Sequence, residues 1–382
     1  MPALGMRLTV LTGRTVPVPL PGPLTARVRA VRVTESDDHR SLFSLTLDAG
    51  RSRTAGALDP VGLAGSPLAA FARVAVVVSF GAVPQVLCDG IVTEVRWTPG
   101  HRSGEATLTV TGEDVSYLLD RVERDVEHPA LDDLPQVLAI LQRYATDGLV
   151  PAALAPPTAD PPLPIDRIPT QHGTDFEHIS GLARRNGFVA YAIPGPTPGT
   201  SRFYWGPPVR AGVQGALSVD MGPETTVSTI SFRTEAWAPT VVSGAVVDRR
   251  TDAVVPIVVP VATRLPLAAV PLWVSARSDL RERRVRDAGS DAIAAQAQAQ
   301  AQVDRSVDAV LAEGELDGAR YGAVLRARAL VGVRGAGWSH DGFWYVRRVE
   351  HTLEPGSYRQ AFTLARDGYG STVPAVPVTA VG

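Results

Sequence analysis

Two histidines and two carboxylates lie within one seven-residue segment: His172, Asp175, Glu177 and His178. Imidazole and carboxylate groups can coordinate zinc. Glu177, however, stands three residues after Thr174, which is the spacing of a helix capping box, and an acid at 175 favours the first turn of a helix. No two of the seven histidines are four residues apart, so a helical His-Glu-x-x-His site is absent. We therefore expect no metal and no cofactor.

Two segments contain residue types that act as nucleophiles in enzymes. Ser339, His340 and Asp341 are the types of a hydrolytic triad. Neighbours in an extended chain point to opposite sides, so these residues predict a polar turn before a strand. Cys88, the sole cysteine, lies in an apolar segment, which favours a small buried side chain over a reactive thiolate. We expect no catalytic residue in either segment.

Phosphate chemistry has little support. All 37 basic residues are arginines, which excludes lysine nucleophiles, Schiff bases and Walker-type lysines. The glycine-rich segment 332–337 lies between two expected strands, whereas a dinucleotide cradle needs a following helix. Turns or helix starts explain three pairs of adjacent acids: Asp37-Asp38, Glu113-Asp114 and Asp132-Asp133.

The composition is that of an ordinary packed protein. At 382 residues the chain is long enough for two or three domains, and 45% hydrophobic with 20% charged residues predicts conventional cores. The net charge of −2 gives no general attraction to nucleic acid or anionic membranes. The N-terminus lacks a signal-peptide pattern, and no apolar segment reaches about 18 residues. We therefore expect a cytoplasmic protein without membrane insertion.

The N-terminal part reads as short strands. Residues 1–23 are proline-rich and predict an irregular arm. Residues 24–120 hold five or more alternating strands at regular spacing, which predicts a small β-barrel. The apolar phase shifts by one residue between Ala30 and Val31, which is the pattern of a β-bulge.

The middle part, 121–222, combines helices with a hairpin. Pro135 and apolar residues at helical spacing predict a helix that begins at Asp133. A Pro-rich loop, 151–169, precedes a second helix, which begins at the Thr174 capping box and ends at Asn186-Gly187. A hairpin with strands at 188–193 and 202–205 follows it.

The C-terminal part predicts a second barrel built from 223–274 and 317–370, followed by a tail at 371–382. The last three strands are expected at 324–331, 343–351 and 358–366, because apolar and polar residues alternate there. Asp341-Gly342 and Pro355-Gly356 supply the turns. Barrel cores or rims are expected to hold Trp97, Trp237, Trp273, Trp338 and Trp344, although an assembly interface would also favour tryptophan and the sequence leaves that alternative open.

A helical insertion at 275–316 interrupts this second barrel. Its arginine-rich start, 277–286, also contains Asp279 and Glu282, so it predicts a helix with mixed-sign pairs rather than a nucleic-acid arm. Alanine and glutamine alternate over 292–302, which predicts either a solvated surface helix or one that packs through close alanine contacts. The pattern favours the surface helix.

The fold class is therefore mainly β with α+β insertions: two similar small barrels, a helix–hairpin middle domain and a long inserted helix. Three features in this order resemble the phage late control D family, the tail baseplate hub related to the N-terminal part of VgrG proteins. They are the first-barrel ending Val110-Thr111-Gly112-Glu113-Asp114, the helix–hairpin unit from Phe176 to Gly206, and the closing strands from Asp341-Gly342 through His351 to Tyr358.

The resemblance implies a structural, non-enzymatic hub in a contractile tail or injection particle. Such a hub is a homotrimer that joins a threefold spike to a sixfold inner tube, with other baseplate subunits around it. Related VgrG chains continue into a spike, so here the resemblance implies a separate spike protein.

Two other functional classes remain open from sequence alone. A tail-associated cell-wall hydrolase would need a convergent acid pair or a His/Asp site within 121–215. A carbohydrate-binding β-module would need exposed, coplanar aromatic side chains.

Overall fold

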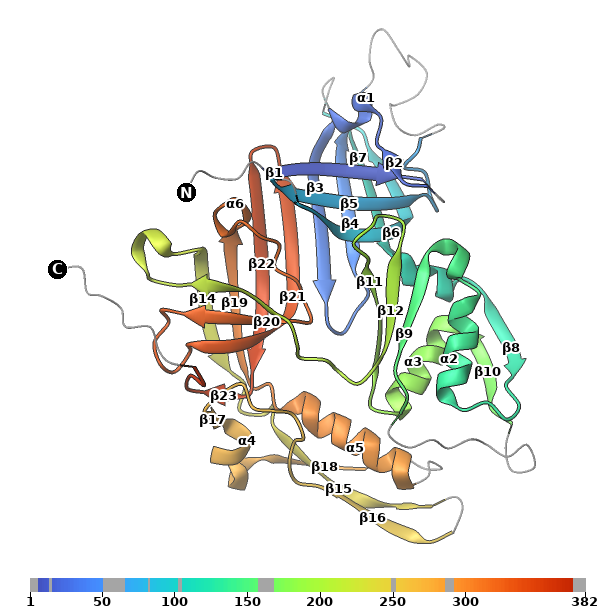
Figure 1. The fold of residues 1–382 in the computed structure, drawn as a ribbon, viewed down its shortest axis with the longest axis vertical. Helices are drawn as coiled ribbons and strands as arrows, with labels where there is room; N and C mark the ends of the chain where they lie inside the picture. The colour runs from blue at the N-terminus through green and yellow to red at the C-terminus, as the bar shows by residue number, and fades with distance from the viewer. Residues whose placement is uncertain are drawn as a thin grey trace, which may run out of the picture.

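The computed structural model describes residues 6–13, 16–50, 66–81, 83–101, 105–156, 168–248, 252–285 and 292–373. They form two β-halves, a middle lobe and a small helix-covered sheet (Figure 1). Most of the Pro-rich loop 151–169 and of the tail 371–382 lies outside the described residues. No described helix is both long and apolar enough to cross a membrane.

One open sheet of 13 strands contains both β-halves. The N-terminal half supplies β1 Met6–Thr12, β2 Val18–Pro19, β3 Val28–Ser36, β4 Leu42–Asp48, β5 Arg73–Phe80, β6 Val83–Thr98 and β7 Thr107–Asp114. The C-terminal half supplies β13 Val213–Ser218, β14 Val227–Thr234, β19 Val310–Asp317, β20 Leu330–Arg334, β21 Gly342–Glu354 and β22 Ser357–Arg366. The order β14-β19-β22-β21-β3-β4-β7-β6-β5-β1-β2 forms the main path, and β20 with β13 branches from β21.

The two halves meet where β21 pairs antiparallel with β3, from Arg348↔Ser36 to Leu353↔Val31. The same edge of β21 pairs with β20 nearer its start, from Tyr345↔Leu330 to Gly342↔Val333. One long strand therefore serves both halves. The pairings of the described strands join the halves side by side and close neither into a barrel.

Alternation places the core as the sequence predicts. In β4, Phe43, Leu45 and Leu47 are buried, whereas Leu42 at the strand start is 49% exposed. The expected bulge is confirmed, because the register of β3 against β4 shifts between Val28 and Ala30. Both halves thus bury one face of a twisted, bulged sheet.

The middle lobe follows the expected pattern. Helix α2, Asp133–Gln142, is capped by Asp132 and buries Val137, Ile140 and Leu141. Helix α3, Asp175–Arg185, begins with the full capping box of Thr174 and Glu177. The hairpin of β11 Val189–Pro194 and β12 Ser201–Gly206 is extended by β9 Leu149–Ala153, and β8 Glu123–Glu127 pairs with β10 Thr170–Thr174.

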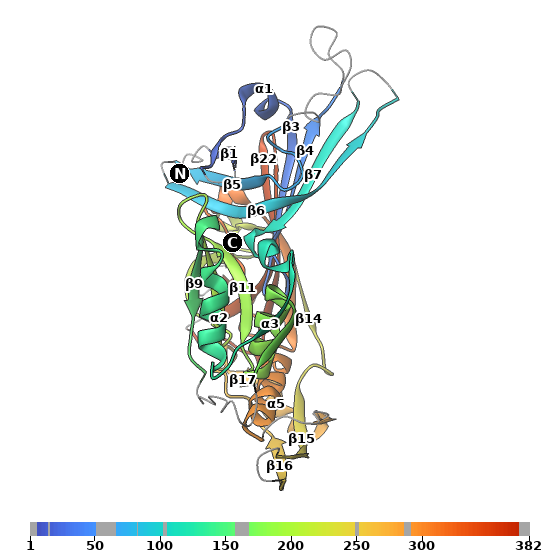
Figure 2. The ribbon, with the colours of Figure 1, turned by 90° about the vertical axis from the view of Figure 1, so that its right-hand side faces the viewer.

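A small sheet lies at the far end of the molecule (Figures 1 and 2). Its order is β16 Val254–Val259, β15 Thr240–Val247 and β18 Arg281–Arg284. Helix α5, Ala292–Ser306, covers one face through Ala295, Ala299 and Val303. The remaining short α-helices and strands are α1 Gly22–Thr25, α4 Leu272–Ser275, α6 Gly318–Tyr321 and the pair β17 Val270–Pro271 with β23 Gly368–Tyr369, and 3-10 helices lie at Val115–Asp120, Ala145–Asp147, Gly222–Glu224 and Arg277–Asp279.

Three local predictions are corrected. The segment 1–23 is not an irregular arm throughout, because β1 pairs with β5 over its full length. The strand expected at 324–331 begins only at Leu330, because the N–H groups of Leu325 and Arg326 donate to the side chains of Gln360 and Gln214 and Arg328 has a left-handed φ of +66°. The segment 275–316 is not one helix, because it contains β18 and most of β19 besides α5.

The alanine–glutamine helix also departs from the favoured prediction. Ala295 and Ala299 are four residues apart and buried against the small sheet, so α5 packs through close alanine contacts. Trp344 is buried, and Trp97 packs partly buried against the core of the N-terminal β-half. Trp237 and Trp338 are 79% and 56% exposed, so neither is a core residue.

The packing of β4 makes a first prediction. The substitution Leu45→Ala should lower the free energy of unfolding by about 2–5 kcal/mol, because Leu45 is fully buried and its loss leaves a cavity. Leu42→Ala in the same strand is the matched control and should change it by less than about 0.5 kcal/mol. Urea unfolding followed by circular dichroism measures both. Equal effects would contradict the core assignment.

Candidate functional site

The four possible metal ligands of the sequence do not converge. His172 Nδ1 lies 2.7 Å from Asp125 Oδ1 on the exposed β8–β10 pair. His178 Nε2 lies 3.0 Å from Gln136 Oε1, and its ring stacks on His128. Burial lowers the pKa of His178 to about 4, so this imidazole is neutral at pH 7.

The two acids of that segment are used inside the fold. Asp175 is fully buried and accepts hydrogen bonds from Tyr144 Oη at 2.7 Å, Gln171 Nε2 at 2.8 Å and Arg143 at 3.1 Å. Glu177 Oε2 accepts from the Thr174 backbone N–H at 2.9 Å, which closes the capping box. Among the described residues no group of three or more His, Cys, Asp or Glu side chains could hold a metal ion.

The triad-like residues form a structural clamp at the start of β21. Asp341 Oδ1 accepts from the Ala336 N–H at 2.8 Å, and the His340 ring stacks on Phe232 with centroids 4.1 Å apart. Buried Arg366 donates to the carbonyls of Ser339 and Asp341 at 2.6 and 2.8 Å. Asp341 and His340 therefore hold the polar turn that the sequence predicted before this strand.

The other reactive types are also placed structurally. Cys88 is 1% exposed, and burial raises the pKa of its thiol well above the usual value. In the glycine-rich turn, Gly335 and Gly337 have φ of +88° and +86°, and a strand follows rather than a helix.

An ion pair between the buried Glu35 and the partly exposed Arg326 lies beneath the β3–β21 pairing, and the sequence did not indicate it. Glu35 of β3 pairs with Arg326, and its second oxygen accepts from the Ala327 N–H at 3.2 Å. Arg326 also donates to the carbonyls of Val86 and Leu87 in β6. Burial alone would raise the pKa of Glu35. The charges of Arg326 and His351 lower it by more, so the pKa of Glu35 lies below its ordinary value.

His351 of β21 completes this cluster. It is fully buried, and its Nδ1 lies 3.0 Å from Tyr358 Oη. Burial lowers the pKa of His351 to about 4, although Glu35 opposes the shift. The same face of β3 carries Val31, Val33 and Glu35, so a polar residue in an inward phase was the signal available in the sequence.

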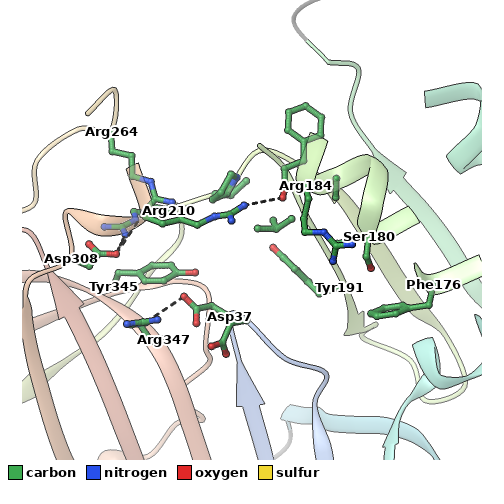
Figure 3. Close-up of a pocket in the computed structure, with 18 residues that line it drawn as sticks. Asp37, Phe176, Ser180, Arg184, Tyr191, Arg210, Arg264, Asp308, Tyr345 and Arg347 are labelled. Atoms are coloured by element: carbon green, nitrogen blue, oxygen red, sulfur yellow. Dashed lines mark hydrogen bonds and ion pairs between the residues drawn. The ribbon is translucent and has the colours of Figure 1, made fainter. Parts of the chain in front are cut away.

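A cavity of about 410 Å³ opens where the two β-halves face the middle lobe (Figure 3). Tyr345 and Arg347 reach it from β21, and Tyr191 and Phe176 reach it from the middle lobe. Two of its arginines form ion pairs across elements: Arg210 with Asp308, and Arg347 with Asp37 at 3.7 Å.

A second cavity of about 440 Å³ lies on the other side of Tyr191. There Arg328 stacks over the Tyr191 ring at 4.0 Å and donates to the His39 carbonyl at 3.3 Å. Arg328 has φ of +66°, a left-handed conformation that costs a non-glycine residue free energy. Both cavities therefore lie between the β-halves and the middle lobe, and arginine and aromatic side chains line both of them.

The buried pair makes a second prediction. Glu35→Gln should lower the free energy of unfolding by about 3 kcal/mol, because it leaves the Arg326 charge without its partner. Glu350→Gln is the matched control: Glu350 is partly exposed, pairs with Arg348 at 3.3 Å, and should contribute less than about 1 kcal/mol. Chemical unfolding at pH 7 measures both. A Glu35→Gln protein as stable as the control would contradict the role of the pair.

His351 makes a third prediction, on pH dependence. Its folded-state pKa of about 4 lies below the ordinary 6.5, so only the unfolded chain gains the proton as pH falls between these values. Stability from this group is therefore complete above about pH 6.5 and falls by about 3 kcal/mol toward pH 4. His351→Gln should reduce that slope, and His178 retains its own contribution over the same window.

The comparison for this experiment is His101→Gln, at an exposed position, which should keep the parent pH profile. Urea unfolding at several pH values from about 7 to about 4 gives the profiles. An unchanged slope in His351→Gln would show that the buried imidazole does not control acid stability.

No protein-family model matches the sequence, and no curated protein sequence matches it. Solved structures match along nearly the whole chain. The tail protein from Neisseria meningitidis has a TM-score of 0.62 at 14% identity, with 95% of this chain and 97% of that chain covered. The prophage MuSo2 43 kDa tail protein from Shewanella oneidensis has a TM-score of 0.61 at 13% identity, with 94% and 98% covered.

A third solved structure is a component of the type VI secretion system of E. coli, described as structurally similar to the T4 tail proteins gp27 and gp5. Its TM-score is 0.54 at 13% identity, with 92% of this chain and 77% of that chain covered. At such identities the likeness concerns the fold. The chain therefore has the mainly β fold of phage tail proteins.

Proposed function

We propose that this chain is a structural baseplate hub, of the kind found in the late control D family, in a contractile phage-tail-like particle. In that role it is a homotrimer that joins a separate spike protein to the sixfold inner tube, with other baseplate subunits around it. The supporting observation is the length of the match: 95% of this chain and 97% of a phage tail protein share one fold.

The arrangement of the sheet supports an adaptor between two symmetries. Each chain carries two β-halves within one sheet, so three chains would present six halves in a ring. A closed ring requires repeated head-to-tail contacts, and paired halves allow one ring to satisfy threefold and sixfold neighbours. The β3–β21 pairing would keep the two halves of each chain in a constant relation.

The side-chain chemistry favours a structural role over the hydrolase and carbohydrate-binding alternatives. Ser339, His340 and Asp341 hold a turn, and the acids of the middle lobe cap helices or pair with arginines. The two most exposed tryptophans, Trp237 and Trp338, lie in separate loops of the sequence. We propose assembly in the cytoplasm into the particle, without nucleic acid or membrane partners.

The solution mass tests this proposal. The purified chain, measured by light scattering alone and mixed with the spike-like protein encoded nearby, should give about three times its mass of 40.4 kDa, or a 3:3 complex. A concentration series separates weak from stable trimers, and a spike from an unrelated particle is the specificity control. A chain that stays monomeric in both conditions would contradict the hub role.

A further inference from the structure

A groove of about 920 Å³ runs between β18 and α5 at the far end of the molecule. Arg281, Arg283 and Arg284 line it from β18, and all three are exposed. Arg184 and Arg305 line both this groove and the 410 Å³ cavity between the β-halves and the middle lobe, which we call the junction cavity. The two hollows therefore form one continuous surface.

This surface is positive although the chain as a whole is not. Its lining includes eight arginines against four carboxylates, in a protein of net charge −2. Arg281, Arg283 and Arg284 make no ion pair with any described residue, and the single acid of β18, Glu282, is hydrogen-bonded to Ser243. Such a concentration of one sign attracts a partner of the opposite sign and orients it.

Strand β18 also offers an open edge. It pairs in parallel with β15 on one side, and among the described strands it has no neighbour on the other. The free N–H and C=O groups of an edge strand are a template on which an extended segment of another protein can add. An arginine-bearing edge of this kind selects segments that carry acidic side chains.

Helix α5 supplies the opposite wall of the groove. Gln298 and Gln302, one helical turn apart, and the half-buried Ala301 line it, whereas Ala295 and Ala299 are buried against the small sheet beneath them. Glutamine amides can donate hydrogen bonds to carboxylates. None of the described residues that line this groove is aromatic, whereas single-stranded nucleic acids are held largely by stacking on aromatic rings.

We propose that this groove binds an extended acidic segment of a partner protein, which adds as a strand to the open edge of β18. Carboxylates on one face of the segment meet Arg281 and Arg283, which share a face of β18, and Arg284 adds positive charge on the other face. The guanidinium fork matches a carboxylate in two parallel hydrogen bonds. The segment continues past Arg184 and Arg305 toward the junction cavity. This inference stands on the groove alone and does not depend on the hub role.

The binding of a labelled twelve-residue peptide of alternating glutamate and threonine, followed by fluorescence anisotropy, tests the proposal on the full chain. Affinity should fall at least about tenfold in the triple variant Arg281→Gln, Arg283→Gln, Arg284→Gln, since the two carboxylate contacts of Arg281 and Arg283 and the added charge of Arg284 are lost. The matched control changes three exposed arginines elsewhere, Arg96→Gln, Arg233→Gln and Arg359→Gln, and should stay within about twofold of the parent. Both triple variants lower the net charge equally.

Three further outcomes would each overturn the inference. Equal losses in the two triple variants would mean that the peptide responds to bulk charge. A peptide with N-methylated backbone amides that binds as tightly would exclude strand addition to β18. A twelve-nucleotide single-stranded DNA that binds more tightly and displaces the peptide would identify the surface as a nucleic-acid site. Circular dichroism of both variants checks that the fold is unchanged.

Discussion

The ion pair between Glu35 and Arg326 is the interaction on which the joined sheet depends. It lies under the β3–β21 pairing and reaches three elements at once: β3, the loop before β20, and the carbonyls at the start of β6. A buried charge is tolerated only when partners replace its lost hydration. Because those partners come from both halves, the cluster is complete only when the halves are correctly aligned. A shift in the register of β3 against β21 would therefore leave Glu35 or Arg326 without its hydrogen-bond partners.

Arginine performs the same task between the lobes, which gives a structural sense to a chain without lysine. Arg73 pairs bidentately with Asp89 inside the first half and also donates to the Asp147 carbonyl of the middle lobe. Arg40 lies 3.8 Å over the Phe176 ring of α3, and Arg328 stacks on Tyr191. A guanidinium can stack on an aromatic ring through its flat face while its N–H groups donate hydrogen bonds in its plane. A single arginine side chain can therefore connect two lobes.

Most of the residues whose types suggested a metal or catalytic site make hydrogen bonds that stabilise helix starts and turns. Asp175 accepts hydrogen bonds from donors in several elements. His340 and Asp341 fix the start of β21, the strand that pairs first with β20 and then with β3 along one edge. At the surface, the exposed arginines and the open edge of β18 have no partner among the described residues.

The sequence by itself determined the strands with clear alternation, the helices that begin at Asp133 and Thr174, and the bulge in β3, because these features depend on neighbours within a few residues. It also determined that the triad-like residues would form a turn. Only the tertiary structure decided that the halves share one sheet, that β1 joins it, and that Arg326 meets Glu35 across 291 positions. Contacts so distant leave no periodic pattern, since they depend on which sheet edges finally meet.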